Sequence, residues 1–227
     1  MITIAIDGPS GAGKSTLARR LSAQLHYLYV DTGAMYRTIG LYGIKQGVDL
    51  KNEAAVCALL PQIKLDLRYV EGAQHMFLND VDVSGEIRTE QVSMAASTVS
   101  AYAAVRAILL ETQRNFAKTS NILMDGRDIG TVVLPQANVK IFLTATPEER
   151  ARRRHAELVQ KGEEASYETV LADVKQRDYN DTHRAIAPLK AAPDAITVDT
   201  TEVDFEGAFA LLLSTIEKKL QADGTQR

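Results

Sequence analysis

The sequence of 227 residues has a single cysteine, Cys57, and no uninterrupted apolar stretch of about 18 residues, the length that a membrane-spanning helix needs. One cysteine excludes an internal disulfide framework and a metal site built from several cysteines, so we expect Cys57 to be a small core residue. The N-terminus also lacks the basic region and cleavage site of a signal peptide. We therefore predict a cytoplasmic protein without a membrane partner.

An excess of charge of one sign is missing as well. Lysine and arginine number 26 against 29 aspartate and glutamate residues, which gives a net charge of -3. This balance provides no general attraction to nucleic acid or to an anionic surface, so any affinity for phosphate must be built locally. Apolar residues make up 45% of the chain, which is ordinary for a globular protein and excludes disorder. The length fits one α/β domain with room for a small insertion.

Short apolar runs alternate with segments that have helical periodicity, a pattern typical of a parallel sheet covered by helices on both faces. The predicted strands are residues 2–6, 27–30, 122–124, 139–143 and 195–198. The predicted helices are residues 16–25, 94–118, 147 to about 162, 166 to about 180, and 205–220. The segment 146–149, Thr-Pro-Glu-Glu, indicates a capping box with proline at the first helical position.

One section departs from this alternation. Between residues 63 and 69, apolar and polar side chains alternate with a period of two, which indicates a strand with one solvent-exposed face. Residues 71–73 have the composition of a hairpin turn, and residues 75–78 form a second extended run. We predict an antiparallel insertion of roughly forty residues, a length at which insertions commonly carry function.

The segment from residue 8 to residue 15 satisfies the pattern G-x-x-x-x-G-K-[ST] between a predicted strand and a predicted helix. Its glycines allow backbone N–H groups to turn inward around phosphates, and the helix N-terminus adds positive potential. Lys14 can reach the β- and γ-phosphates, and Ser15 can ligate magnesium. The residues expected to bind the nucleotide are Gly8, Pro9, Ser10, Gly11, Ala12, Gly13, Lys14, Ser15 and Thr16.

Two further polar segments follow predicted strands, at the edge where α/β sheets bind ligands. In the first, Arg37 lies on the opening turns of a helix and can grip an anionic acceptor with two hydrogen bonds. An N-cap by Asp31 or Thr32 with a solvated arginine explains this segment equally well. In the second, residues 125–128 read Asp-Gly-Arg-Asp, and Asp125 can hold a metal through water as a Walker B carboxylate does.

Arginines gather at positions 150, 152, 153, 154, 177 and 184. A run of charge on a helix is usually a solvated face, and neighbouring glutamates offer ordinary ion pairs, so we expect this of most of them. Phosphoryl transfer also needs cations that follow the charge moving from donor to acceptor. One or two of these arginines are therefore expected to be catalytic, on a short lid over the phosphates. Nucleic-acid binding by residues 150–154 is disfavoured, because this segment is short, is flanked by glutamates and has no interleaved aromatic residues.

Together the segments IDGPSGAGKST, DTGAMYR, DVSGEIRTEQV, DGRDIGTVV, VKIFLTA and RD…HRAIAPL resemble the bacterial cytidylate kinases over nearly the whole chain. The resemblance implies an α/β P-loop kinase fold with a five-stranded parallel sheet flanked by helices, a small antiparallel β insertion in the acceptor-binding region, and a short lid. It also implies a single domain. The core would comprise residues 1–61, 119–148 and 189–227, with the insertion at about 62–100 and the lid at about 149–188.

The resemblance further implies transfer of the γ-phosphoryl group of ATP, with Mg²⁺, to CMP or dCMP. The residues that look like the cytosine readers are Thr32, Ser97, Arg106 and Asp128. Arg37 and Arg127 resemble the clamps on the acceptor phosphate, Arg177 and Asp181 the residues that touch its sugar, and Arg184 a group near the transferring phosphoryl. The expected catalytic residues are Lys14, Arg127, Arg177 and Arg184.

Two alternatives stay open. A kinase for shikimate, a sugar acid or another nucleotide shares the P-loop and the fold, and the base-reading set distinguishes it. A nucleotide-binding switch module that phosphorylates nothing is the other alternative, which the lack of a guanine-reading N-K-x-D motif disfavours. We expect a monomer with small-molecule substrates.

Overall fold

A computed structural model describes residues 1–70, 73–222 and 224 of the chain. The chain divides into two compact units, one formed by Met1–Tyr29 together with Ala117–Arg227 and the other by Val30–Phe116. Each unit is considered by itself below. Most of the predicted hairpin turn at residues 71–73 lies outside the described residues.

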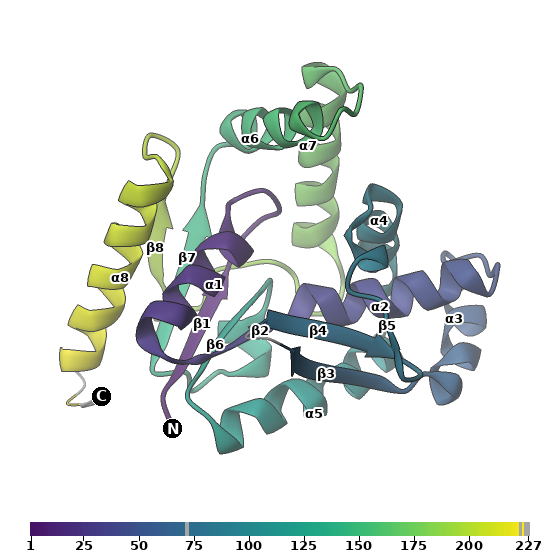
Figure 1. Cartoon of the computed structure of the whole chain (residues 1–227), viewed down its shortest axis with the longest axis horizontal. Helices are drawn as coiled ribbons and strands as arrows, with labels where there is room; N and C mark the ends of the chain where they lie inside the picture. Colours follow the sequence, from purple (N-terminus) through teal and green to yellow (C-terminus); the bar gives the residue numbers. More distant parts are fainter. Residues whose placement is uncertain (71–72, 223, 225–227) are drawn as a thin grey trace. The chain divides into compact units, whose positions relative to one another are not determined.

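The central sheet has five strands: β1 (Thr3–Asp7), β2 (Leu28–Asp31), β6 (Ile122–Gly126), β7 (Val139–Thr144) and β8 (Ile196–Asp199). Their order is β2-β6-β1-β7-β8, with β1 parallel to both β6 and β7 and with β7 parallel to β8 (Figure 1). The predicted parallel sheet is confirmed, and each strand lies within two residues of its predicted bounds. Because β1 is central, the loop that follows it lies at the middle of the sheet's carboxyl edge.

Among the described residues, the first unit contains α1 (Lys14–Leu25), α6 (Pro147–Gln160), α7 (Tyr167–His183) and α8 (Phe205–Ala222), together with the π-helical turn η3 (Ile129–Val133). The apolar faces of α1 and α8 join the strands in one core, in which Ile4, Leu21 and Leu212 are fully buried. Helices α6 and α7 form a hairpin held by its own apolar cluster, which includes Leu158 and Val170 (Figure 1). Both packing faces follow from apolar residues spaced at helical intervals.

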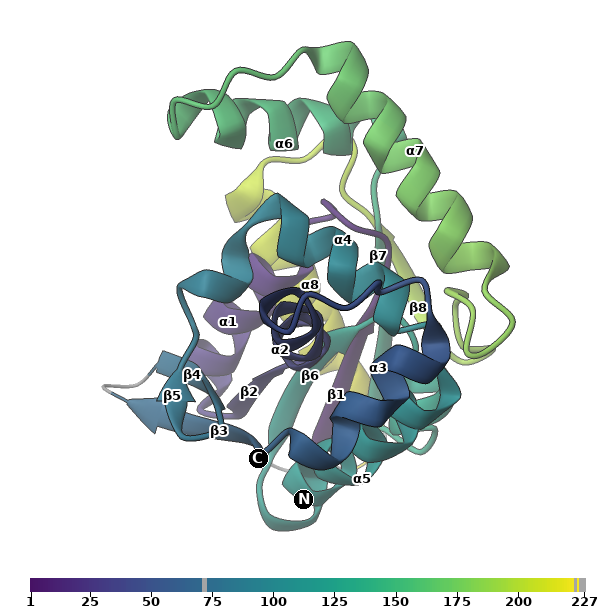
Figure 2. The same ribbon diagram turned by 90° about the vertical axis from the view of Figure 1, so that its right-hand side faces the viewer.

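The second unit contains a three-stranded antiparallel sheet (Figure 2). Its strands are β3 (Leu65–Val70), β4 (Ala73–Leu78) and β5 (Val81–Asp82), and β4 pairs with both of the others. This confirms the predicted antiparallel insertion. Its helices are α2 (Thr32–Lys45), α3 (Glu53–Leu59), α4 (Glu90–Val99) and α5 (Ala103–Thr119). Helices α2 and α4 pack so closely that a Cβ atom at Gly40 would lie 2.9 Å from the Cβ atom of Ala95.

The prediction of one helix over residues 94–118 is wrong, because α4 and α5 are separate helices bent by 100°. The first begins early, since the Thr89 hydroxyl caps it by accepting from the Val92 N–H at 3.3 Å. At the break, the Ser100 hydroxyl bonds the backbone of the last turn, and the Tyr102 hydroxyl is held 2.8 Å from the Leu50 carbonyl. Side chains that bond the backbone locally compete with helix propagation.

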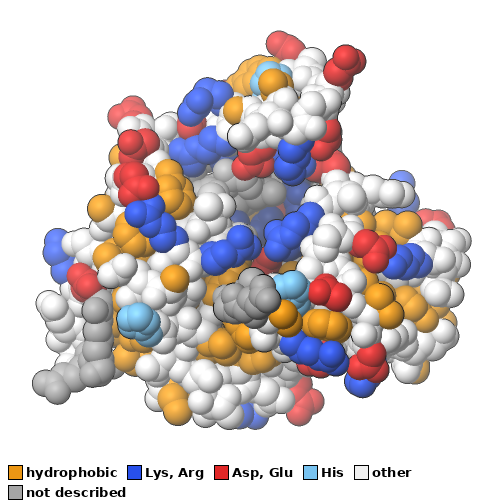
Figure 3. Space-filling view, in the orientation of Figure 1, with side chains coloured by type: hydrophobic (Ala, Val, Ile, Leu, Met, Phe, Trp, Pro, Cys, Tyr) orange, Lys and Arg blue, Asp and Glu red, His pale blue; other side chains and the backbone are white. Residues whose placement is uncertain are grey.

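Two smaller expectations concern Cys57 and the surface. Cys57 is half-buried rather than a core residue, because α3 buries Val56 alone. Acidic and basic side chains are interspersed over the face seen in Figure 3, in keeping with a net charge near zero.

Within the described residues, no single helix is long and apolar enough to cross a membrane, and α4 with α5 passes that test only as a bent pair.

Candidate functional site

The loop between β1 and α1 has the backbone that its glycines predict. Gly8 has a φ of 150°, and a Cβ atom there would lie only 1.9 Å from the Leu143 carbonyl oxygen of the neighbouring strand β7. Gly13 has a φ of 83° and occupies the N-cap of α1 without a side-chain hydrogen bond. A left-handed residue at this point turns successive N–H groups toward one side, where an anion can be bound. The predicted P-loop is therefore formed.

Lys14 is the first residue of α1, and its side chain is buried. Its Nζ atom donates to the Pro9 carbonyl oxygen at 2.6 Å. Burial, and then the nearby Arg127 guanidinium, lower the pKa of Lys14 well below its usual value, while Asp125 and other carboxylates oppose this shift. A cation held in such a desolvated position interacts strongly with an added anion, because little water screens it.

Ser15 and Asp125, the predicted magnesium pair, are in direct contact. The Ser15 hydroxyl donates to Oδ2 of Asp125 at 2.8 Å, and the Tyr29 hydroxyl donates to Oδ1 at 2.8 Å. Tyr29 was not predicted as a functional residue, because it looks like any aromatic residue of a buried strand. Hydroxyl and carboxylate oxygens are the ligands that Mg²⁺ prefers, usually together with phosphate oxygens and water. Among the described residues, no group of three or more His, Cys, Asp or Glu could hold a metal without such help.

Asp7 is a second carboxylate that sequence reasoning missed. It ends β1, and its two oxygens accept from the backbone N–H groups of Ile129 and Gly130, each at 2.7 Å. Burial raises the pKa of Asp7 from 3.8 to about 6, although both hydrogen bonds act in the opposite direction. Asp7 thereby anchors the turn that directly follows Asp128. One signal was present in the sequence, since Asp7 is an ionisable residue at the end of an otherwise apolar strand.

The structure brings Arg127, Asp128, Arg177, Asp181 and Arg184 together in the first unit. Nε of Arg127 lies 2.8 Å from Oδ2 of Asp181, and Nη2 of Arg184 lies 3.7 Å from Oδ1 of Asp128. Burial would raise the pKa of Asp181, but Arg127, with Arg177 and Arg184, holds it below its usual value. The cluster is a network of opposite charges in which the two carboxylates are buried and the three arginines are half-buried. Guanidinium groups of this kind are suited to binding phosphate.

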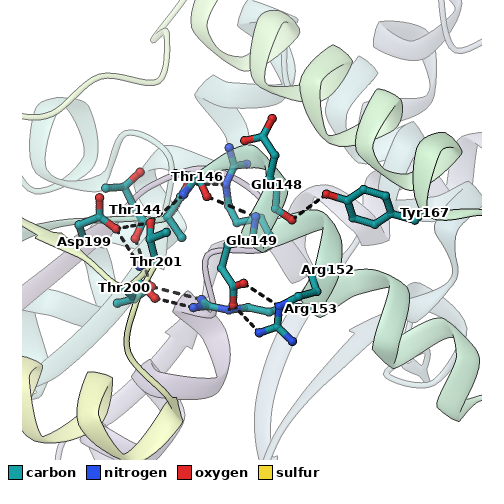
Figure 4. Close-up of polar contacts among 12 residues, drawn as sticks. Thr144, Thr146, Glu148, Glu149, Arg152, Arg153, Tyr167, Asp199, Thr200 and Thr201 are labelled. Carbon is teal, nitrogen blue, oxygen red and sulfur yellow. Dashed lines mark hydrogen bonds and ion pairs between the residues drawn. The ribbon is translucent and has the colours of Figure 1, made fainter.

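The first turn of α6 is bound to the loop after β8 (Figure 4). Arg153 donates to the hydroxyl and to the carbonyl oxygen of Thr200, and the Thr146 N–H donates to the Thr201 hydroxyl at 3.0 Å.

The capping box predicted at the start of α6 is only half formed. Thr146 accepts from the Glu149 N–H at 3.3 Å, but the Glu149 carboxylate pairs with Arg152 and Arg153 instead of returning to Thr146.

Of the arginines on α6, Arg152 is 69% exposed and is paired with a glutamate of its own helix, as expected for most of this run. Arg153 donates to the Thr200 carbonyl oxygen in the loop after β8. Arg150 differs, because its side chain is only 3% exposed and binds Asp178 of α7. The sequence did not distinguish Arg150 from its neighbours, since burial on this helix depends on segments far away in the chain.

In the second unit, both readings of the segment after β2 are partly right. Asp31 is the N-cap of α2, accepting from the Ala34 N–H at 2.9 Å, as one alternative expected. Arg37 is not solvated, however. Its side chain is 20% exposed and pairs with Asp31 at 2.8 Å, while its Nε atom is buried without a hydrogen-bond partner among the described residues. Such a donor is costly to leave unsatisfied, so an anionic ligand oxygen is its natural partner.

The remaining predicted acceptor residues of this unit lie on three helices. Thr32 opens α2 and is buried, and Ser97 on α4 is half-buried. Arg106 on α5 is 8% exposed, donates to the Ser100 carbonyl oxygen at 3.4 Å and lies 5.8 Å from the ring centroid of Tyr36. Their roles as cytosine readers stay a prediction.

Comparison with known proteins yields a consistent set of relatives. The family described as cytidylate kinase matches residues 4–218 of the chain. A cytidylate kinase of Carboxydothermus hydrogenoformans is 50% identical over 218 residues, which cover 95% of this chain and 97% of the relative. A cytidylate kinase of Leuconostoc mesenteroides is 46% identical over 217 residues, covering 96% and 97%. Among solved structures, an uncharacterized protein from Eubacterium ventriosum matches with a TM-score of 0.51 at 12% identity over 96% of this chain and 99% of its own, which supports the fold alone.

Proposed function

Because the chain belongs to the cytidylate kinase family, we propose that it transfers the γ-phosphoryl group of ATP to CMP or dCMP, giving ADP and CDP or dCDP. The observation that carries this proposal is the formed P-loop, whose Ser15 binds Asp125 at 2.8 Å in a chain that matches the family from residue 4 to residue 218. A P-loop alone would leave the acceptor open.

On the donor side, the P-loop N–H groups would bind the ATP phosphates, and Lys14 would leave the Pro9 carbonyl to contact the β- and γ-oxygens. Ser15 and Asp125 fit a magnesium ion by their oxygen chemistry, with Asp125 acting through a water molecule. The ion would neutralise charge on the phosphates. Tyr29 keeps Oδ1 of Asp125 occupied and so orients Oδ2 toward Ser15.

On the acceptor side, Arg37 and Arg127 would clamp the CMP phosphate, with Arg177 and Asp181 at its sugar. An acceptor phosphate oxygen is already anionic at neutral pH, so no general base is needed. Transfer would proceed in line without a covalent enzyme intermediate, aided by alignment and by the converging charges of Lys14 and Arg184. A carboxylate suits the base-reading role of Asp128, because it accepts from the exocyclic amino group of cytosine.

The cytosine-reading role of the predicted base-reading residues can be tested separately from the P-loop kinase activity. ADP release with Mg-ATP is measured with CMP, dCMP, UMP, AMP, GMP, shikimate and no acceptor. We expect turnover with CMP and dCMP above all others, and we expect Asp128→Asn to reduce that preference while Asp173→Asn, at an exposed position of α7, does not. Preference for another acceptor would overturn the cytosine assignment and keep the P-loop kinase. Turnover that is absent, or independent of any acceptor, would favour the switch module.

We also propose that the enzyme acts as a monomer, in the cytoplasm and without a nucleic-acid partner, as the sequence predicts. Light scattering of the purified protein tests the first point directly. A dimer mass that persists on dilution would contradict it.

A further inference from the structure

Arg150 lies where simple electrostatics disfavours an arginine. It is in the first turn of α6, close to the positive end of the helix dipole. Its side chain is also only 3% exposed. Burial of a guanidinium costs free energy unless its N–H donors form hydrogen bonds and its charge is paired. A residue kept in such a place requires strong compensating contacts, and the structure shows where they come from.

The guanidinium of Arg150 binds three separate segments of the first unit. Nε donates to the Ala145 carbonyl oxygen at 2.9 Å, at the end of the loop from β7. Nη1 donates to the Ser10 carbonyl oxygen in the P-loop at 3.0 Å. Nη1 and Nη2 together form a forked pair with the Asp178 carboxylate of α7, at 2.9 and 2.5 Å. A bidentate pair of this kind fixes the orientation of both partners as well as their distance.

The stem of Arg150 also packs against the P-loop. A Cβ atom at Gly11 would lie 3.3 Å from Cβ of Arg150, and Gly11 has a φ of 76°. Two carbonyl groups of this loop accept from cationic side chains: Lys14 donates to that of Pro9, and Arg150 donates to that of Ser10. Arg150 thus holds the phosphate-binding loop through both its stem and its guanidinium.

On α7, Asp178 is followed one turn later by Asp181, and each carboxylate holds an arginine from a different segment. Asp178 holds Arg150, and Asp181 holds Arg127 of the turn after β6. Arg177 directly precedes Asp178 in the helix. The position of this stretch of α7 is therefore fixed from two sides, and one of the two fixing groups is bound to the P-loop.

We propose that Arg150 is a positioning residue for phosphoryl transfer. By binding Ser10 and Asp178 with one guanidinium, it sets the distance between the donor phosphate loop and the part of α7 that carries Arg177 and Asp181. This inference rests on the proposed kinase activity. Arg150 does not itself touch the reacting atoms in this assignment.

The test compares Arg150→Lys, Asp178→Asn, the double variant and the control Arg152→Lys, whose residue is exposed on the same helix. Conservative changes are chosen because complete removal of one partner of a buried pair can prevent folding. A lysine cannot reproduce the fork, so we expect Arg150→Lys to lower kcat by about 10- to 100-fold, the loss that small misplacements cause. Asp178→Asn should lower kcat about tenfold, the loss of one charged hydrogen bond. Arg152→Lys should keep the wild-type kcat.

The double variant separates a positioning role from general stabilisation. Residues that act as one unit are not additive, so the double variant should be no slower than Arg150→Lys within about twofold. Rates are compared per folded molecule, at a temperature well below each melting midpoint. A kcat that stays at the wild-type value while only the melting midpoint falls would overturn the proposal. Losses that multiply in the double variant would overturn it as well.

ADP affinity, measured by calorimetry without an acceptor, tests the role of Arg150 independently of the proposed CMP kinase activity. Arg150→Lys should weaken ADP binding severalfold because the Ser10 carbonyl of the P-loop loses the forked guanidinium that holds it, whereas Arg152→Lys should bind as the wild type does. If the wild type binds ADP but does not phosphorylate CMP, the proposed function fails while ADP binding still decides the role of Arg150. If CMP is phosphorylated and Arg150→Lys matches the wild type in ADP affinity and in kcat, the inference alone fails.

Discussion

The Ser15 hydroxyl donates a hydrogen bond of 2.8 Å to Asp125, although 110 residues separate the two in the chain. The contact joins the first turn of α1 to the end of β6, whose strand lies beside β1. Neighbouring parallel strands end at the same edge of a sheet. A P-loop that follows one strand therefore lies beside a carboxylate at the end of the neighbouring strand. The same geometry brings together two oxygen groups of the kind that Mg²⁺ prefers.

Asp125→Asn should therefore weaken the response to magnesium. The amide keeps the shape of the carboxylate but loses its charge, and changes of supporting groups around a metal typically cost 10- to 100-fold in affinity. We expect the Mg²⁺ concentration for half-maximal activity to rise by about that factor. Mn²⁺ binding to the ADP complex, followed by electron paramagnetic resonance, should weaken in parallel. Unchanged dependence on both ions would exclude Asp125 from the metal site.

Lys14→Ala should abolish most turnover without loss of stability. Removal of one group that stabilises transition-state charge typically lowers kcat about 10²- to 10³-fold. Burial lowers the pKa of Lys14, which means that the folded protein carries its charge at a cost. The melting midpoint should therefore stay the same or rise, since functional sites commonly reduce stability. Lys175→Ala, at an exposed lysine of α7, is the matched control for kcat. A fall in both kcat and melting midpoint for Lys14→Ala would contradict this account.

The sheet and the P-loop could be predicted because their determinants are local. Each strand is a continuous apolar run, and the motif from Gly8 to Ser15 is contiguous. The strand positions therefore needed no knowledge of tertiary contacts, and their predicted bounds were wrong by at most two residues. The break between α4 and α5 was missed because the hydroxyls of Ser100 and Tyr102 decide it through contacts that helical periodicity does not include.

The supporting residues of the site could not be predicted for a similar reason. Tyr29 binds Asp125 across 96 positions, and Arg150 binds Ser10 across 140. Each looks ordinary in its own segment, and only the folded sheet brings the partners together. Asp7 is intermediate, because its place at the end of an apolar strand marks it as unusual, but its partners are backbone N–H groups that carry no sequence signal.

Asp7 should make stability depend on pH between about 4 and 6. Burial raises its pKa from 3.8 to about 6 in the folded protein, so within this window the folded state binds the proton more tightly than the unfolded chain does. The contribution of Asp7 to the free energy of unfolding therefore falls as the pH rises through the window, by about 3 kcal/mol at most, and is constant above it. Urea unfolding of the wild type and of Asp7→Asn, compared at several pH values, isolates this term. A difference between the two proteins that does not change with pH would show that Asp7 titrates as in the unfolded chain.

Arg37→Met should weaken the acceptor and leave the donor unaffected. The Arg37 guanidinium has a buried Nε donor without a partner among the described residues and a second donor held by Asp31 at 2.8 Å, so it is oriented before an anion arrives. Charged hydrogen bonds contribute about 1.5–3 kcal/mol each, and their loss should raise KM for CMP about 10- to 100-fold. KM for ATP should change less than about twofold, since the P-loop motif alone supplies the predicted ATP contacts. Methionine keeps the length of the stem, and Arg114→Met on the exposed face of α5 controls for loss of a positive charge in the same unit. If Arg37→Met raised both KM values equally, or lowered kcat with KM for CMP unchanged, Arg37 would act on folding or on transfer itself rather than as the clamp on the acceptor phosphate.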